Sequence, residues 1–272
     1  MKILCIVLVV IFVLAMVYLY MVCPRIFHKP DRTAFLGVHY AHRGLFDNAK
    51  DAPENSLRAI RKAVDAGYGI EFDVQLSKDN IPVVFHDADL KRACAVDGKV
   101  WEYTLEELQR MKLFRSDQTI PTFAEVLKTV GGKVPLIIEY KMDRPDEKVC
   151  ELGNALLKDY IGPYCIESFH PLALKWYRQN RPDVMRGQLG EDYVKEGRTE
   201  WYCMVGSYLL SNFLTRPDFI AYCHKDAKNV SRRICRRLGA LSVAWTIKNR
   251  EEYERAKSQF DLFIFDSFIL KD

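Results

Sequence analysis

From residue 38 onward, short runs of apolar residues alternate with segments in which apolar residues recur at helical spacing. Each short run predicts a buried strand, and each helical segment predicts a connection between strands. Helices are expected at residues 53–66, 104–111 and 122–130, the first of them ended by Gly67. The strand candidates are residues 38–42, 69–75, 81–85, 136–140, 165–169, 185–189, 219–222, 241–246 and 262–266.

The second and third strand candidates are separated by only a few turn-forming residues, Ser77 to Asn80. A parallel crossover needs a longer connection, so these two strands are expected to form an antiparallel hairpin. If Asp79 and Asn80 form a two-residue turn, the pairing places Asp73 opposite His86.

Eight strands remain when the return strand of the hairpin is left out, and helical segments separate most of them. With about 240 residues outside the N-terminal segment, this count predicts one α/β domain at residues 37–272. The expected fold is a TIM-type (β/α)8 barrel with a β-hairpin after its second strand. Such barrels carry their chemistry at the carboxyl ends of the strands.

The N-terminal segment has a different pattern, because residues 3–22 are apolar and carry no charge. That length suits one transmembrane helix, so residues 1–22 are expected to be a membrane anchor and residues 23–36 a linker. A cleaved signal peptide is the alternative, but the segment ends in bulky rather than small residues. One lysine precedes the span, whereas Arg25, Lys29 and Arg32 follow it. The positive-inside rule therefore favours a single-pass protein with a cytoplasmic domain.

Composition narrows the classes of function. The 272 residues carry a formal net charge of +4, and no zinc-finger or helix-turn-helix pattern is present, so nothing indicates a nucleic-acid partner. The eight cysteines form no CxxC pair, so nothing indicates a disulfide framework or a zinc site. This pattern fits a reducing compartment. One basic cluster, Ser231 to Arg237, lies on a helical segment. A solvated outer helix is favoured there over contact with anionic headgroups.

Acidic side chains gather at the predicted strand ends. Glu71 and Asp73 lie two apart on one strand and so share a face. Glu139 lies near the end of the strand predicted at residues 136–140. Three carboxylates at one rim predict a site for one divalent cation, Mg²⁺ or Ca²⁺. Structural ion pairing with Arg43 and Lys141 is the alternative.

Two histidines, His42 and His86, also fall at predicted strand ends. Histidine exchanges protons near neutral pH, so this pair is expected to act as general base and general acid. With Arg43 beside the acids to bind an anion, the set indicates metal-assisted chemistry on a phosphate ester.

A family resemblance follows from the motifs in their order along the chain. His42-Arg43-Gly44, Pro53-Glu54-Asn55-Ser56, Glu71-Phe72-Asp73-Val74, Pro82-Val83-Val84-Phe85-His86-Asp87, Glu139-Tyr140-Lys141, Glu167-Ser168-Phe169 and Trp245-Thr246 resemble the glycerophosphodiester phosphodiesterases. The resemblance extends from residue 38 to residue 266.

The resemblance implies a TIM barrel with a small insertion at roughly residues 88–120 and a reaction that releases sn-glycerol 3-phosphate and an alcohol. It implies metal binding by the three acids and acid–base roles for the two histidines. It places Arg43 and Lys141 on the phosphate, Glu54 and Asn55 around the site, and Trp245 against the glycerol.

Two other functions remain open at this point. The first is a phospholipase C- or D-like enzyme that acts on intact lipids with similar histidines and acids. The second is a membrane-anchored barrel that binds glycerophosphodiesters without hydrolysing them, although neither a predicted metal ligand nor a predicted histidine is missing. The sequence indicates neither the alcohol group nor the oligomeric state.

Overall fold

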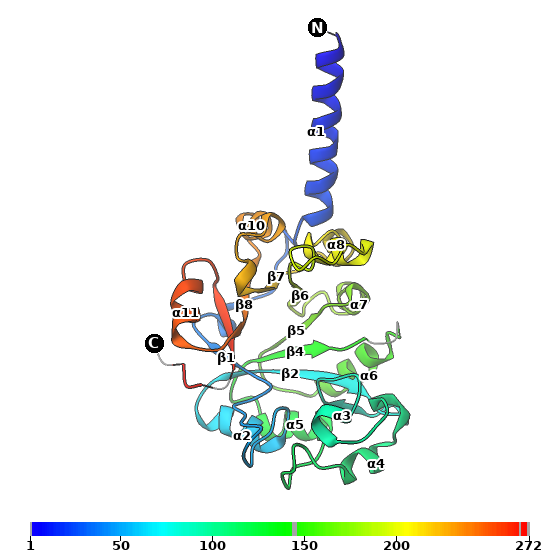
Figure 1. The fold of residues 1–272 in the computed structure, drawn as a ribbon, viewed down its shortest axis with the longest axis vertical. Helices are drawn as coiled ribbons and strands as arrows, with labels where there is room; N and C mark the ends of the chain where they lie inside the picture. The colour runs from blue at the N-terminus through cyan, green and yellow to red at the C-terminus, as the bar shows by residue number, and fades with distance from the viewer. Residues whose placement is uncertain (1, 143–145, 267, 271–272) are drawn as a thin grey trace.

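The computed structural model describes residues 2–142, 146–266 and 268–270 (Figure 1). The predicted limits at residues 1 and 272 lie outside this part of the chain. A barrel forms the body, and one long helix extends from it.

The barrel is closed by eight parallel strands, as predicted, because β1 pairs with both β2 and β9. Each strand is nearly or wholly buried, which explains why short apolar runs predicted them. The strands are β1 (His39–His42), β2 (Gly69–Leu76), β4 (Leu136–Tyr140), β5 (Tyr164–Ser168), β6 (Arg186–Gly190), β7 (Phe219–Cys223), β8 (Leu241–Ile247) and β9 (Leu262–Phe265).

Helices surround the barrel (Figure 1), and most of them bury apolar side chains against it. They are α2 (Leu57–Asp65), α5 (Phe123–Val130), α6 (Lys148–Leu157), α7 (Pro171–Asn180), α8 (Trp201–Ser207), α9 (Asn212–Thr215), α10 (Val230–Arg237) and α11 (Arg250–Ala256), with short 3₁₀ turns at Thr33–Phe35 and His224–Asp226.

A second apolar cluster includes Tyr40 and Ile137. Because side chains two apart share a face of a strand, His42 and Glu139 lie on the same face as these residues, nearer the carboxyl ends. The barrel interior is therefore apolar at its base and charged at the rim.

The first predicted helix begins later than expected. Its helical residues start at Leu57 because Ser56 caps the helix, with its hydroxyl accepting a bond from the Ala59 N–H at 3.1 Å. Asn55 takes a left-handed backbone conformation, with φ of 59°. The preceding residues 53–55 therefore form a loop at the rim of the barrel rather than a first helical turn.

The hairpin after β2 forms, but the predicted register was wrong by one residue. Strand β3 (Pro82–Val84) pairs antiparallel with β2, and the Phe85 N–H donates to the Asp73 carbonyl at 3.0 Å. Asp73 therefore lies opposite Phe85, not His86. The cause is a three-residue loop, in which Asn80 has a φ of 62° and the Ser77 N–H donates to the Ile81 carbonyl.

The residues after the hairpin form a small unit with its own core. It contains α3 (Lys91–Cys94), a 3₁₀ turn at Val100–Glu102 and α4 (Leu105–Arg110). Their apolar side chains pack on Val83 and Phe85 of the hairpin. The insertion thus extends from the same segment that brings His86 to the rim.

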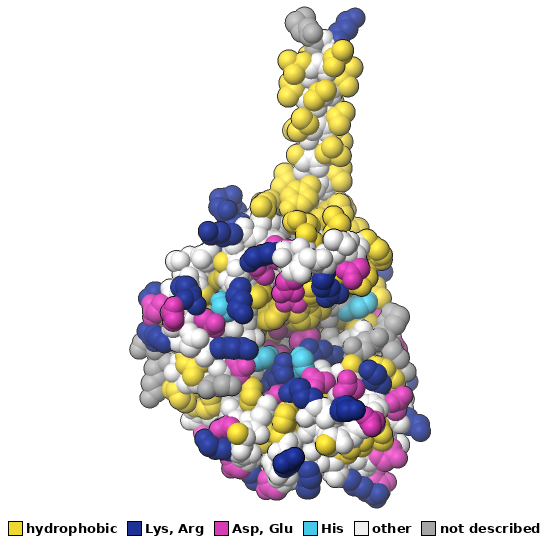
Figure 2. Space-filling view, viewed as in Figure 1, with side chains coloured by type: hydrophobic (Ala, Val, Ile, Leu, Met, Phe, Trp, Pro, Cys, Tyr) yellow, Lys and Arg dark blue, Asp and Glu magenta, His cyan; other side chains and the backbone are white. Residues whose placement is uncertain are grey.

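Helix α1 (Lys2–Val22) is long and apolar enough to cross a membrane, and most of it is exposed (Figure 2). A signal sequence would have the same length and composition. Its last turns contact the barrel: the hydroxyls of Tyr18 and Ser231 lie 2.7 Å apart, and the Asn212 amide donates to the Val22 carbonyl at 2.9 Å.

Candidate active site

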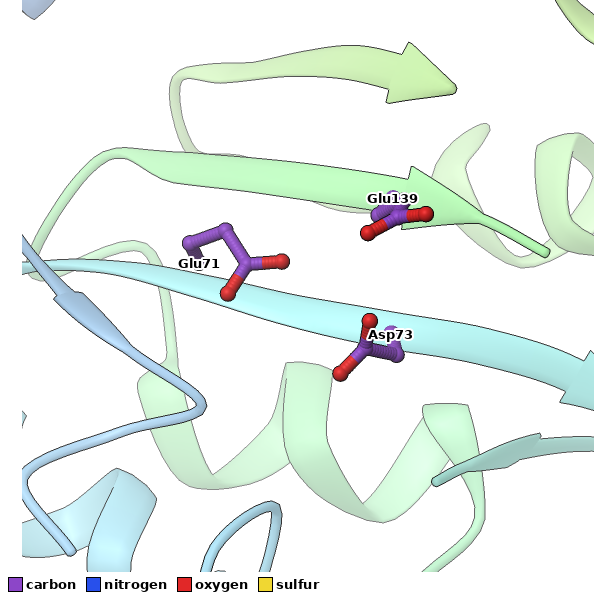
Figure 3. A group of neighbouring side chains, drawn as sticks. All are labelled: Glu71, Asp73 and Glu139. Atoms are coloured by element: carbon purple, nitrogen blue, oxygen red, sulfur yellow. The ribbon is translucent and has the colours of Figure 1, made fainter. Parts of the chain in front are cut away.

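Three buried carboxylates meet at the rim of the barrel (Figure 3). Glu71 and Asp73 lie on β2, and Glu139 lies beside Asp73 in the register of β2 with β4. One oxygen from each lies within 4.8 Å of the others. The side chains predicted as metal ligands therefore converge on a space that one cation can fill.

Their surroundings shift the pKa values of the three acids in different directions. Burial, followed by the charges of Asp73 and other nearby acids, raises the pKa of Glu71 well above its usual range. Burial also raises the pKa of Glu139, although Lys141 opposes that shift. Burial would raise the pKa of Asp73 too, but Lys141, His86 and Arg43 outweigh it and hold the pKa well below its usual range.

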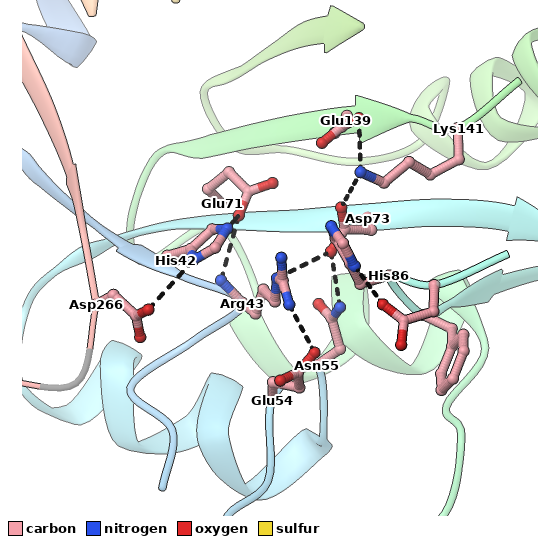
Figure 4. Close-up of polar contacts among 12 residues, drawn as sticks. His42, Arg43, Glu54, Asn55, Glu71, Asp73, His86, Glu139, Lys141 and Asp266 are labelled. Carbon is pink, nitrogen blue, oxygen red and sulfur yellow. Dashed lines mark hydrogen bonds and ion pairs between the residues drawn. The ribbon is translucent and has the colours of Figure 1, made fainter. Parts of the chain in front are cut away.

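Two cations, Lys141 and Arg43, lie against these acids (Figure 4). The Lys141 ammonium is 2.7 Å from a Glu139 oxygen and 3.0 Å from an Asp73 oxygen. Burial would lower the pKa of Lys141, but Asp73 and Glu139 raise it above its ordinary value. Arg43 is shared, because its Nη1 donates to Glu54 at 2.7 Å while its Nε lies 3.7 Å from Asp73.

The two predicted histidines face the acids from the end of β1 and from the segment that follows β3 (Figure 4). His42 Nε2 lies 3.9 Å from Glu71, and its Nδ1 lies 3.9 Å from Asp266. Burial and the neighbouring Arg43 lower the pKa of His42, so it is neutral at pH 7. His86 Nδ1 lies 2.6 Å from Asp87, which leaves Nε2 as the other ring atom available for proton exchange.

The loop after β1 shapes one wall of the site. Arg43 and Gly44 both have positive φ, and a Cβ on Gly44 would lie 2.7 Å from the Ala59 backbone. The Asn55 N–H donates to the Arg43 carbonyl, and its side-chain amide donates to Asp73 at 2.8 Å. Asn55 therefore supports an acid of the trio.

Arg92, on α3 of the insertion, is a site residue that the sequence did not reveal. Its guanidinium donates to both oxygens of Glu54, at 2.6 and 3.0 Å, and to both oxygens of Asp87, at 3.0 and 2.6 Å. Since Asp87 contacts His86, Arg92 connects the insertion to a predicted catalytic group. A lone arginine on a four-residue helix gives no sequence signal of such a role.

Two further acids lie close to the site. Asp266, which the sequence placed at a strand end without a role, faces His42. Glu167 lies beside Glu139 in the strand register. Burial and then the Glu139 charge raise the pKa of Glu167 well above its usual range. Neither acid was predicted as a ligand, and Glu167 is absent from the converging trio.

Beside these charged groups, the face of the barrel is hollowed (Figure 2). The cleft has a volume of about 830 Å³ and begins at His86, Glu139 and Lys141. It continues between Phe169 and α8, and much of its lining is apolar. Trp245 meets the Phe169 ring edge to face, with ring centroids 5.6 Å apart, so the predicted aromatic contact residue stands beside the cleft.

Comparison with known proteins agrees with this geometry. The model of the glycerophosphoryl diester phosphodiesterase family matches residues 42–268. The chain belongs to this family. A glycerophosphodiester phosphodiesterase of Caldanaerobacter subterraneus is 29% identical, over 79% of this chain and 87% of the relative. Glycerophosphodiester phosphodiesterase 1 of Bos taurus is 35% identical, over 84% and 76% respectively.

A solved structure from the family has the same fold. The phosphodiesterase of Oleispira antarctica, in complex with the product sn-glycerol 3-phosphate, aligns with a TM-score of 0.68 and 25% identity. The alignment covers 86% of this chain and 94% of that protein. That phosphodiesterase thus shares this barrel over nearly its whole length.

Proposed function

We propose that this phosphodiesterase-family protein hydrolyses glycerophosphodiesters to sn-glycerol 3-phosphate and an alcohol. The observation that supports this most strongly is the convergence of the acidic trio, two histidines and two cations at one rim. The product complex of the Oleispira antarctica enzyme supports the same reaction. A barrel that only bound such compounds would not need two proton-transfer groups beside a metal site.

Glu71, Asp73 and Glu139 would hold one divalent cation, Mg²⁺ or Ca²⁺. The fit rests on their carboxylate chemistry and on their charge: Asp73 and Glu139 share Lys141, while Arg43 is divided between Asp73 and Glu54. When bound, such a cation would offset negative charge on a phosphate oxygen. It would also relieve the repulsion that raises the pKa of Glu71.

The remaining chemistry belongs to the side chains. Arg43 and Lys141 would bind nonbridging phosphate oxygens, whose charge grows in the transition state. One of His42 and His86 would take a proton from the nucleophile, and the other would give a proton to the leaving alcohol. The nucleophile is either water or the glycerol 2-hydroxyl of the substrate. The second route would release the alcohol and form a cyclic phosphate, which water would then open to sn-glycerol 3-phosphate. Glu54 and Asn55 would orient Arg43 and Asp73, and Trp245 would contact the glycerol.

Purified full-length protein tests this proposal when it is treated with chelator and then resupplied with Mg²⁺ or Ca²⁺. Release of sn-glycerol 3-phosphate from glycerophosphocholine is expected only with metal. His42→Ala and His86→Ala should each lower turnover about a hundredfold or more, and the double variant should cost little beyond the worse single one. His28→Ala is the control. Near-normal turnover in a folded His42→Ala or His86→Ala protein would refute the acid–base pair.

A second substrate class is supported by the apolar cleft. A glycerophosphodiester that keeps one acyl chain could place its phosphate at His86 and Lys141 and its chain between Phe169 and α8. The volume of about 830 Å³ lies in the upper part of the range for ligand pockets, about 300–1,000 Å³. A rat lysophospholipase D is 29% identical over 51% of this chain.

Turnover of lysophosphatidylcholine and glycerophosphocholine by the same preparation separates the two substrate classes. If the acyl chain occupies the cleft, Val205→Trp should raise KM for the lysophospholipid, because the larger side chain would fill space that the acyl chain needs. KM for glycerophosphocholine, which has no acyl chain, should stay within about twofold. Equal effects on both substrates would exclude the acyl-chain assignment without affecting the first proposal.

Helix α1 would anchor the enzyme as a single membrane span, with residues 1–22 as the anchor, 23–36 as the linker and 37–272 as the barrel domain. Length, apolar composition and exposure support the span. The basic residues that follow it favour a cytoplasmic barrel.

A further inference from the structure

A groove at the foot of α1 carries more positive charge than its surroundings neutralise. It has a volume of about 710 Å³ and is lined by Arg25, Arg178, Arg186 and Arg216. The Asp218 carboxylate forms ion pairs with two of these arginines, 3.7 Å from Arg25 and 3.8 Å from Arg186. Among the residues that the structure describes, Asp218 is thus the one acid in ion pairs with these four guanidinium groups.

The guanidinium groups also repel one another. Arg186 is 2% exposed, and burial lowers its pKa to about 10. Asp218 opposes this shift by raising the pKa, whereas Arg25 and Arg178 lower it further. Its Nη1 has no hydrogen-bond partner among the described residues, whereas its Nε and Nη2 donate to carbonyls of residues 215 and 216. An anion in the groove would supply the missing charge.

The other wall of this groove is the end of the apolar helix. Met16, Leu19 and Tyr20 of α1 line it, and each is at least 40% exposed. The site therefore presents cations on the barrel side and an apolar face along the helix. A soluble anion would use only the first of these surfaces, whereas a membrane phospholipid would use both.

We propose that this groove binds the headgroup phosphate of one anionic phospholipid, with the acyl chains lying along Met16 and Leu19 of α1. The arginine guanidinium is suited to phosphate, since its planar donors match the phosphate oxygens. The position supports this occupant, because Arg216 donates to the carbonyls of Tyr20 and Cys23. The cations therefore lie where the apolar helix ends, at the level of lipid headgroups.

This lipid would also fix how the barrel sits on its anchor. Arg178 donates from α7 to the carbonyls of residues 213 and 214 on α9, and the Asn212 side chain of α9 donates to the end of α1. A phosphate held between Arg25 and Arg178 would join the anchor to two barrel helices. The groove is distinct from the rim, since none of the residues that line it belongs to the catalytic set.

Full-length protein in neutral detergent tests the site through its melting temperature during titration with dioctanoyl phosphatidylglycerol or dioctanoyl phosphatidylcholine. The anionic lipid should raise the melting temperature, and the zwitterionic lipid and inorganic phosphate should not. The Arg25→Gln/Arg178→Gln variant should bind phosphatidylglycerol about 25-fold more weakly, at about 1 kcal/mol for each basic side chain near a membrane surface.

The matched control removes two arginines from α10, also close to α1. Arg233 and Arg237 are exposed, and Arg233→Gln/Arg237→Gln should leave the affinity within about twofold. Equal weakening by both double variants would show diffuse attraction and overturn the proposal, as would an equal shift with inorganic phosphate. If the groove variant does not fold, native mass spectrometry of the unaltered protein tests the proposal instead. The protein is expected to retain one phosphatidylglycerol molecule in preference to other lipids, and a protein that retains none would overturn the site.

Discussion

Replacing Glu71 by glutamine separates the metal site from structural ion pairing. In the metal-free protein burial, followed by the charges of nearby acids, raises the pKa of this carboxyl group well above its usual range. Two unit charges 4.8 Å apart repel by about 3.5 kcal/mol at an effective dielectric constant of about 20. Taking up a proton avoids this repulsion, and glutamine copies the protonated form in size and polarity. Glu71→Gln should therefore change metal-free stability by only about 1 kcal/mol.

Addition of metal should stabilise the unaltered protein more than Glu71→Gln. A cation at about 100 times its dissociation constant stabilises the folded barrel by about 2.7 kcal/mol, which is a rise of about 5–11 °C in melting temperature for a domain of this size. If loss of one ligand weakens binding about a hundredfold, the same metal concentration gives Glu71→Gln only about 0.4 kcal/mol, or about 1 °C.

The pH dependence has a defined sign. Because the folded pKa of Glu71 lies above its unfolded value, the folded state binds the extra proton, and metal-free stability falls as pH rises from about 4.5 through the folded pKa. Glu71→Gln should remove that part of the slope. The measurement is thermal unfolding by circular dichroism in chelator and in metal, at several pH values.

The matched control for this experiment is Glu167→Gln. Glu167 is as buried as Glu71 and also has a raised pKa, but lies outside the converging trio. This variant should keep the full stabilisation by metal. A metal-induced shift in Glu71→Gln equal to that of the unaltered protein would contradict the ligand assignment and favour structural ion pairing.

Three other perturbations test separate parts of the molecule. Arg92→Ala should lower kcat at least about tenfold, and Arg92→Lys should restore little of it, because only a planar guanidinium can hold two carboxylates. Steady-state kinetics measures this, with Arg110→Ala as the control. An equal kcat in the two alanine variants would contradict the prediction. Lys141→Met should lower the free energy of unfolding in chelator by about 3–5 kcal/mol, since two buried acids lose their shared partner; denaturant titration with an unchanged midpoint would oppose this. Protease added to intact cells should spare the barrel, whereas its digestion would reverse the orientation, and a shorter mature chain would show that residues 3–22 are cleaved.

The barrel could be predicted because its strands are buried on both faces. Such strands are continuous apolar runs, and polar residues interrupt them only at the rim. Glu71 and Asp73 stood out for this reason: two acids in a buried strand need a partner. The alternation of side chains placed them on one face, and the structure brings Glu139 beside them.

Local backbone conformation limited the remaining predictions. The hairpin register depended on whether the loop had two or three residues, and Asn80 settles this through a positive φ that the sequence does not fix. The helix start depended on Asn55 in the same way. Arg92 was missed for another reason, since its contact with Glu54 spans 38 positions and joins a helix of the insertion to the loop after β1. No periodicity records a contact of that kind.

These loop contacts show that the insertion is part of the active site. The barrel strand fixes His42 directly, but His86 follows the short strand β3 and depends on what surrounds it. Asp87 contacts the His86 ring, and Arg92 donates hydrogen bonds to Asp87. Arg92 also donates to Glu54 in the loop after β1. The apolar core of the insertion packs on the strand that carries His86. The spacing of the two histidines is therefore set jointly by the barrel and by the insertion, and a barrel without the insertion would keep the acids but lose the position of His86.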